Sequence, residues 1–170
     1  MMCDSYIFAP DRFMEEMGEV EIVTYSPKYK QDFIRLNKQW IETYFKIEPS
    51  DIDTFGNIEA KIMSQGGQIF IALVDGNAVG CCALIPHPET GWHELAKMAV
   101  DPRHQGHGAG RKLGEALLSY ARHHGVRHIF LEGNTRLKAS IALYRKLGFQ
   151  EEPMDHPAYS RCDIMMYIDL

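Results

Sequence analysis

A glycine-rich stretch in the second half of the chain is the segment best suited to bind an anion. Residues 99–112 read Ala-Val-Asp-Pro-Arg-His-Gln-Gly-His-Gly-Ala-Gly-Arg-Lys, with glycine at three alternate positions. An apolar run precedes this stretch, and a segment with helical spacing of apolar residues follows it. Glycines let a backbone approach a ligand closely, and the first N–H groups of a helix lack partners within that helix. The stretch therefore predicts a phosphate-binding turn at the start of a helix.

Positive charge gathers around this turn, although the net charge of the chain is −5. Asp101 is the only acid in the interval 98–114, which also holds two arginines, one lysine and two histidines. A local excess of positive charge favours an anionic ligand. We expect positive charge near its phosphates from Arg103, Arg111 and Lys112.

Two known phosphate-binding motifs compete for this stretch. A Walker A loop requires Ser or Thr after its lysine, but Leu113 follows Lys112, so this motif is excluded. A dinucleotide fingerprint fits better, because the glycines alternate and Glu132 follows at the spacing of a ribose-binding acid. Against it, residues 101–105 separate the preceding apolar run from the first glycine, and too little chain follows Glu132 for a doubly wound sheet. A dinucleotide site and a glycine turn without a ligand stay open as alternatives.

Length and composition limit the class of protein. The chain has 170 residues, 45% of them hydrophobic, which fits a single domain with a packed core. No apolar run approaches the ~20 residues that a membrane span needs. The sequence pI of about 5.9 argues against a general nucleic-acid binder. We therefore expect neither a membrane nor a nucleic acid as partner.

The cysteines and histidines do not indicate a metal. The four cysteines have no zinc-like spacing, and no histidine pair brings a third ligand with it. Residues 1–11 contain acids and no basic segment before an apolar run, so a secretory signal is not expected. Reduced cysteines without such a signal predict a cytoplasmic protein with no metal.

The apolar pattern predicts an alternating order of strands and helices. We expect strands at 19–25, 68–74, 78–85, 92–100, 126–132, 149–152 and 161–168, and helices at 28–45, 58–64, 109–124 and 137–147. A turn at Asp75-Gly76-Asn77 makes a hairpin, and the strand–helix–strand unit around the glycines should be right-handed and parallel. This order predicts a mixed α/β sheet with helices on both faces, in a domain of residues 19–170 preceded by an extension of residues 1–18.

Several of these motifs together resemble a known family. The pattern Gln105-x-x-Gly108-x-Gly110 is similar to the signature Gln/Arg-x-x-Gly-x-Gly/Ala of the GNAT superfamily of acyl-CoA-dependent N-acetyltransferases. Residues 95–102 resemble its fourth strand, and the run Ala-Leu-Tyr-Arg-Lys-Leu-Gly-Phe at 142–149 resembles its fourth helix. The resemblance implies a single GNAT-like domain with a mixed, mostly antiparallel sheet that splays between strands 4 and 5. It also implies acetyl-CoA as co-substrate.

The resemblance assigns cofactor-binding roles to two segments. The pyrophosphate would be bound by Gln105, Gly106, His107, Gly108, Ala109, Gly110 and Arg111. The pantetheine arm would bind the backbone of Met98, Ala99 and Val100, and the N–H of Met98 or Ala99 would polarise the thioester carbonyl. Asn134, at the end of the fifth strand, would contact the pantetheine or the opening between the strands.

The resemblance also suggests the groups that move protons. Tyr144 matches the helix-four tyrosine that protonates the departing thiolate. Glu94 lies where the histone-acetyltransferase branch has its catalytic base, with Glu132 and His93 as alternatives for proton transfer. Strand alternation places Glu94 on the same face as Ala96 and Met98 unless a bulge intervenes.

The acceptor site is expected between residues 26–67, 86–91 and 153–162. Those segments contain Trp40, Tyr44, Phe45, Asp51, Asp53, Phe55, Tyr159 and Arg161. Their acids would favour a cationic amine, and Arg161 would hold a carboxylate if the acceptor were an amino acid. We therefore expect an enzyme that acetylates a small-molecule or peptide amine in a ternary complex. A non-catalytic acyl-CoA-binding regulator is the alternative, and a homodimer is a family-level expectation.

Overall fold

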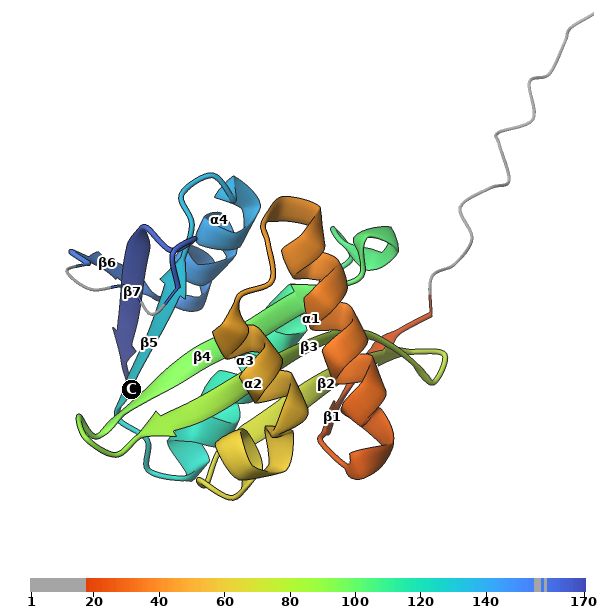
Figure 1. The fold of residues 1–170 in the computed structure, drawn as a ribbon, viewed down its shortest axis with the longest axis horizontal. Helices are drawn as coiled ribbons and strands as arrows, with labels where there is room; N and C mark the ends of the chain where they lie inside the picture. The colour runs from red at the N-terminus through yellow and green to blue at the C-terminus, as the bar shows by residue number, and fades with distance from the viewer. Residues whose placement is uncertain (1–17, 155–156, 158) are drawn as a thin grey trace, which may run out of the picture.

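The computed structural model describes residues 18–154, 157 and 159–170 and contains one seven-stranded sheet, in the order β1-β2-β3-β4-β5-β7-β6 (Figure 1). Its strands are β1 (Val20–Thr24), β2 (Gln68–Val74), β3 (Asn77–His87), β4 (Trp92–Val100), β5 (His128–Gly133), β6 (Gln150–Glu152) and β7 (Ile164–Asp169). Neighbouring strands are antiparallel except β4 and β5, which are parallel. The mixed, mostly antiparallel sheet is confirmed. Residues 1–17 of the expected extension lie outside the described residues.

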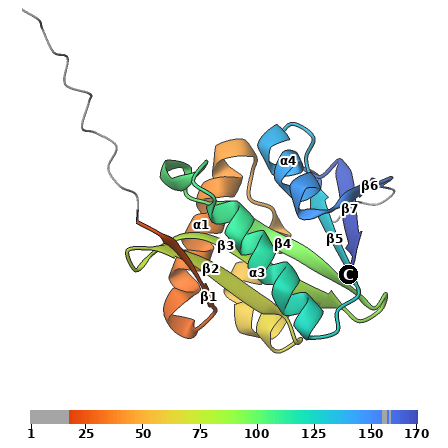
Figure 2. The same cartoon turned by 180° about the vertical axis from the view of Figure 1, so that it is seen from behind.

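Helices cover both faces of the sheet, as expected. They are α1 (Lys30–Tyr44), α2 (Pro49–Gly56), α3 (Ala109–His123) and α4 (Lys138–Leu147). Helices α1 and α2 lie on one face, and α3 lies on the other (Figures 1 and 2). Helix α4 packs beside α3, where its Ile141 joins the apolar cluster that contains Leu113 and Leu117. Of the helices in the described part of the chain, none combines the length and apolar character needed to cross a membrane.

The sheet is held by one apolar cluster on each face. Leu113, Leu117 and Ile129 are buried on the α3 side, and Phe33 and Ile62 are buried on the α1 side. Burying one such side chain stabilises the fold by about 1.5–3 kcal/mol. Strand β2, second in the sheet order, is buried along nearly its whole length between the two clusters.

Strand β3 is longer than its apolar run predicts. Pairing continues to His87, which lies opposite Trp92, and a tight turn follows in which Thr90 and Gly91 donate to the His87 carbonyl at 3.1 and 2.9 Å. The strand expected at 78–85 therefore runs two residues further, to His87. The pairing partner across the hairpin, rather than local hydrophobicity, fixes the end of the strand.

A helix that the sequence reading missed begins at Pro49. The sequence predicts no helix between residues 45 and 58. Instead, Glu48 and Asp51 form a capping box, with Pro49 in the first turn. Proline and acidic residues are found both after the end of a helix and at the start of one. Here they cap the start of α2.

Strands β4 and β5 separate soon after they meet. They pair only at His93–Ile129 and Glu94–Phe130, and beyond this point the described strands diverge (Figure 1). On its other edge, β4 carries a bulge opposite Cys81–Ala83, where Lys97 adopts a positive φ of 54°. The split exposes the edge of β4 toward β5 from Leu95 onward.

Candidate functional site

Two adjoining hollows follow the split. The splay cleft lies between the diverging strands and is lined, among others, by Trp40, Phe45, Glu94, Lys97, Glu132, Asn134, Tyr159, Arg161 and Cys162. The turn groove lies between the glycine turn and α4 and is lined, among others, by Tyr44, Ala99, Val100, Gln105, Gly106, Gly108, Arg136, Lys138 and Lys146. Both hollows share Trp40, Met98, Leu137, Ser140 and Tyr144. A ligand in one hollow can therefore reach into the other.

The glycine turn presents free backbone amides to the turn groove. Gly106 and Gly108 have positive φ values of 79° and 86°, and open space surrounds the position of a Cβ at both. The first hydrogen bond of α3 runs from the Lys112 N–H to the Gly108 carbonyl at 3.0 Å. The amides of residues 109–111 thus have no acceptor inside the helix and can bind an anion.

Most of the residues expected to bind a cofactor line the turn groove. They are Met98, Ala99, Val100, Gln105, Gly106, Gly108, Ala109, Gly110 and Arg111. His107 is not among the lining residues. Asn134 lines the splay cleft instead, where its side chain donates to the Arg161 carbonyl at 2.6 Å and accepts from the Arg136 N–H at 2.9 Å. Asn134 therefore ties the end of β5 to the segment before β7.

The cations at the groove differ from those the sequence suggests. Arg103 forms three hydrogen bonds with Asp101, which is buried and whose pKa these bonds lower to about 2. Lys112 donates to the Val20 carbonyl of β1 at 2.9 Å and is not among the residues that line the groove. Arg111 does line the groove, although its side chain also pairs with Glu115. Further cations come from Arg136, Lys138 and Lys146, which the sequence reading missed because the α4 end of the groove is distant in sequence.

Tyr144 lies where the two hollows meet. The residue is buried on α4, and its ring packs against Phe149 with centroids 6.2 Å apart. Burial raises the pKa of its phenol above the usual value of 10. Tyr144 is therefore a neutral hydroxyl at physiological pH.

Glu94 is the last residue of β4 that pairs with β5, so it lies at the closed end of the split. Its carboxylate lines the splay cleft, is 15% exposed and lies 2.9 Å from Nε2 of His87. Because of the bulge at Lys97, Met98 packs on the α3 side of the sheet instead of sharing a face with Glu94 and Ala96. The bulge is the exception that the sequence analysis allows for, and it moves Met98 off the face of Glu94 and Ala96.

A histidine that the sequence reading did not single out accompanies Glu94. Nδ1 of His87 lies 3.0 Å from Oε1 of Glu89, so its ring bridges two carboxylates. The hydrogen bond with Glu94 raises the pKa of His87. His93, considered earlier for proton transfer, instead lines a separate hollow with Tyr120 on α3, and burial lowers its pKa. It does not line the splay cleft, whereas Glu132 does.

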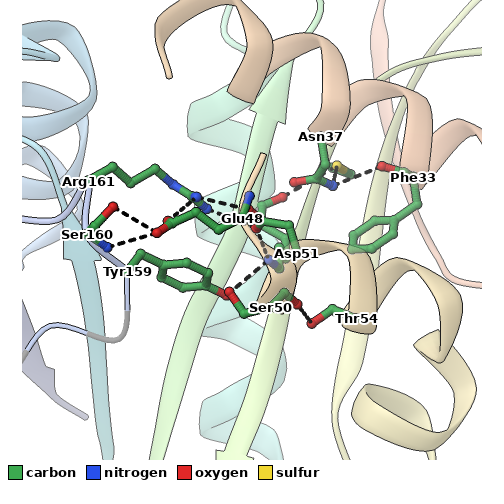
Figure 3. Close-up of polar contacts among 11 residues, drawn as sticks. Phe33, Asn37, Glu48, Ser50, Asp51, Thr54, Tyr159, Ser160 and Arg161 are labelled. Atoms are coloured by element: carbon green, nitrogen blue, oxygen red, sulfur yellow. Dashed lines mark hydrogen bonds and ion pairs between the residues drawn. The ribbon is translucent and has the colours of Figure 1, made fainter. Parts of the chain in front are cut away.

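A buried ion-pair cluster forms one wall of the splay cleft (Figure 3). Asp51 is 0% exposed and accepts from Nζ of Lys97 at 3.0 Å and from both terminal nitrogens of Arg161 at 2.9 Å. Arg161 also donates to Glu48 at 2.7 Å, and Lys97 donates to the Tyr159 hydroxyl at 3.1 Å. Burial acts to raise the pKa of Asp51, but hydrogen bonds from Arg161, the Glu48 backbone and Lys97 lower it to about 2.

The cluster contains or contacts four of the eight residues expected around an acceptor, namely Asp51, Phe55, Tyr159 and Arg161. Phe55 packs 5.4 Å from the Lys97 ammonium, and Arg161 stacks on the Tyr159 ring. Asp53 lies outside the cluster and pairs with Lys61 at the surface of α2. Arg161, which we expect to hold a carboxylate if the acceptor is an amino acid, is paired with Asp51 and Glu48 in this structure.

The arrangement can bind an anion in the groove and exchange protons in the cleft. Within the described residues, no group of three or more His, Cys, Asp or Glu side chains is placed to hold a metal ion. The residues that line the two hollows, with His87 beside Glu94, offer backbone amides, carboxylates, an imidazole, a thiol and a phenol.

Sequence comparison connects this geometry to known proteins. A family model described as "Acetyltransferase (GNAT) family" matches residues 32–149. The N-acetylaspartate synthetase of Rattus norvegicus is 38% identical over 96 residues, which are 55% of this chain and 32% of that protein. The match thus spans about a third of that relative's length.

Structural comparison gives the same fold. A GNAT-family acetyltransferase from Staphylococcus aureus Mu50 superposes with a TM-score of 0.78 at 23% identity, covering 89% of this chain and 99% of that one. YncA from Salmonella typhimurium, solved with its cofactor acetyl-CoA, gives a TM-score of 0.71 at 19% identity, covering 89% and 94% of the two chains.

Proposed function

The chain belongs to the acetyltransferase (GNAT) family, and from this membership we propose that it transfers an acetyl group from acetyl-CoA to a primary amine of a small molecule or peptide. The observation that carries the proposal is the continuity between the splay cleft and the turn groove at Met98 and Tyr144. A thioester can lie at that junction while its diphosphate binds the glycine turn and an amine enters the cleft. The sheet, with its single parallel pair, does not favour the dinucleotide alternative.

In this proposal the pyrophosphate binds the amides of residues 105–110 at the start of α3. A helix N-terminus contributes about 0.3–1 kcal/mol toward an exposed anion. The arm of the co-substrate lies along the open edge of β4 at Met98, Ala99 and Val100, where the split leaves the edge facing β5 without a strand partner. Support for acetyl-CoA comes from YncA, which shares the fold and was solved with that molecule.

Replacing Gly108 by alanine is expected to weaken coenzyme A binding about tenfold. An L-residue at a φ of 86° costs roughly 1–2 kcal/mol, and the new Cβ enters the open space that the diphosphate would approach. Isothermal titration calorimetry measures the dissociation constant. Gly125→Ala is the matched control, because Gly125 follows the other end of α3, has a φ of 72° and also faces open space. Equal affinities in the two variants would argue against binding at the turn.

Glu94 and Tyr144 divide the proton transfers of the reaction. The acceptor ammonium must lose a proton before its nitrogen can attack, and the carboxylate at the closed end of the split is placed to take it. The thiolate leaves as the tetrahedral adduct collapses, and Tyr144 supplies its proton from the junction of the hollows. An amide of Met98 or Ala99 donates to the oxygen on which negative charge develops.

Tyr144→Phe is expected to lower kcat about 10–100-fold. This loss lies at or below the lower limit of the usual range of about 10²–10⁴-fold for a general acid, because a thiolate of pKa about 8.5 is a stable leaving group. Release of free thiol from acetyl-CoA, with an amine that the wild type accepts, measures the loss. Tyr120→Phe on α3 serves as control, since Tyr120 lines neither hollow. An unchanged rate in Tyr144→Phe would remove Tyr144 from the mechanism.

A panel of amines tests the proposed function itself. Purified protein is mixed with acetyl-CoA and, separately, with amino acids, monoamines, polyamines and short peptides, and thiol release is followed. We expect amine-dependent release with at least one class. Tight coenzyme A binding without release from any class would favour the non-catalytic regulator, and thermal stabilisation by NAD instead of coenzyme A would favour the dinucleotide alternative.

A further inference from the structure

A row of three ionisable side chains leads out of the splay cleft along the β3–β4 hairpin. Glu94 lies inside the cleft and is 15% exposed, His87 lies next to it at 31%, and Glu89 at the hairpin turn is 67% exposed. Oε2 of Glu94 is 2.9 Å from Nε2 of His87, and Oε1 of Glu89 is 3.0 Å from Nδ1. The three side chains therefore form a continuous hydrogen-bonded path from the closed end of the split to solvent.

The backbone fixes this path in place. Glu94 pairs with Ile85 across the β3–β4 hairpin, and His87, two residues beyond Ile85, lies on the same face as a diagonal neighbour. The ring of His87 packs edge-on against Phe130 at 5.1 Å, and Phe130 is the β5 partner of Glu94. The imidazole is thus held by three strands at the point where the sheet begins to split.

The proposed reaction needs a route for a proton. An ammonium and acetyl-CoA give an amide, a thiol and one free proton, because one of the two protons lost by nitrogen ends on the thiol. Glu94 is mostly enclosed, so the other proton must leave through a neighbouring group or through water in the cleft. Only a group that can both accept and release a proton near neutral pH serves this purpose, and histidine is such a group.

We propose that His87 carries the proton from Glu94 out of the site to Glu89 and bulk water. This inference rests on the proposed function. The N–H bond of the ammonium breaks as an O–H bond forms on Glu94, and that proton then moves to Nε2 of neutral His87, which becomes imidazolium. The Nδ1 proton passes to Glu89 and on to water, which leaves both carboxylates ionised and His87 neutral with its proton on Nε2, and a half-turn of the ring exchanges the two nitrogens before the next turnover. His87 acts through Glu94 and is a positioning residue with respect to the substrate.

The charges facing His87 agree with this role. Glu94 on β4 and Glu89 in the turn stabilise the imidazolium, and Phe130 on β5 contributes an uncharged ring. His93 is the other titratable neighbour, and its pKa is lowered by burial and by the charge on His87. The raised pKa of His87 makes its ring a stronger proton acceptor than an unpaired histidine.

His87→Gln tests the relay with an acceptor found in the amine panel. Glutamine can still hydrogen-bond to Glu94 but cannot titrate. We expect kcat to fall about 10–100-fold near pH 7.5, with the acceptor KM and the coenzyme A dissociation constant within about twofold of wild type. The ascending limb of the pH–rate profile should shift, and added imidazole should restore at least part of kcat.

Two further variants separate the relay from a structural role. His128→Gln is the matched control, because His128 pairs with Asp169 at 2.7 Å and does not line the cleft. Its kcat and pH profile should match wild type. Glu89→Gln changes only an exposed side chain, and we expect a fall of a few-fold that also responds to imidazole, which keeps the test valid if His87→Gln does not fold.

The outcomes are distinct. A wild-type protein that acetylates no amine would contradict the proposed function. An active wild type whose His87→Gln and Glu89→Gln variants keep its kcat and pH profile would overturn the relay alone. A loss in His87→Gln that imidazole does not restore and that leaves the pH profile unmoved would likewise overturn it.

Discussion

Replacing Glu94 by glutamine is expected to lower kcat about 10²–10⁴-fold, the usual range for loss of a general base. Glutamine has the same shape but cannot accept a proton from the acceptor ammonium. Glu94 has this role in our proposal because it ends the β4–β5 pairing and faces the cleft. The measurement is steady-state thiol release across pH 6–9.5, where the loss should be greatest at neutral pH and shrink as solvent deprotonates the amine at high pH.

Glu132→Gln is the matched control for this substitution. Glu132 lines the same cleft from β5, so it offers a second carboxylate in the same hollow. We expect its kcat to stay within a few-fold of wild type and its dissociation constant for coenzyme A to be unchanged. A large loss in Glu132→Gln with near-normal activity in Glu94→Gln would transfer the base role to Glu132.

Asp51→Asn is expected to destabilise the protein by about 3–5 kcal/mol, the cost of removing one partner from a buried ion pair. The substitution leaves Lys97 and Arg161, which are 6% and 12% exposed, without their shared carboxylate. Asp51 also links α2 to the β4 bulge and to the segment before β7, so its loss should loosen a wall of the splay cleft. Chemical denaturation at pH 7 measures the free energy of unfolding.

The difference in unfolding free energy between wild type and Asp51→Asn should decrease at acidic pH. The folded pKa of Asp51 is about 2, below the unfolded value of about 3.9. Its stabilisation is therefore fully present above pH 4 and is lost as the pH falls through about 2. The gap between wild type and Asp51→Asn should be constant near neutral pH and narrow below pH 4.

Asp53→Asn is the matched control, because it removes a carboxylate from the same helix, α2. Asp53 pairs with Lys61 at the surface, where both side chains are 52% exposed, so little change in stability is expected. If Asp51→Asn unfolded at the same denaturant concentration as Asp53→Asn, the cluster would not stabilise the cleft wall.

Local sequence signals predict the parts of this molecule that depend on neighbouring residues. The hairpin at Asp75-Gly76 forms because both residues adopt positive φ, as that turn requires. The glycine turn before α3 is predictable for the same reason, because Gly106 and Gly108 also adopt positive φ. The placement of Tyr144 inward follows from its spacing of three from Ile141 on α4.

Contacts between distant residues account for what the sequence does not predict. Asp51 meets Arg161 across 110 positions of the chain, so no local pattern relates them. The pairing of His87 with Glu94 depends on a hairpin register that extends two residues beyond the apolar run of β3. The bulge at Lys97 depends on a mismatch with β3, and it turns Met98 to the other face.

A crystal structure with coenzyme A bound tests the central claim most directly. We expect the diphosphate on the amides of residues 105–110 and the pantetheine arm along β4 between the diverging strands, with the sulfur near Tyr144. Coenzyme A bound with full occupancy elsewhere on the protein, with those amides contacting only water, would contradict the claim that the split sheet and the glycine turn form the site.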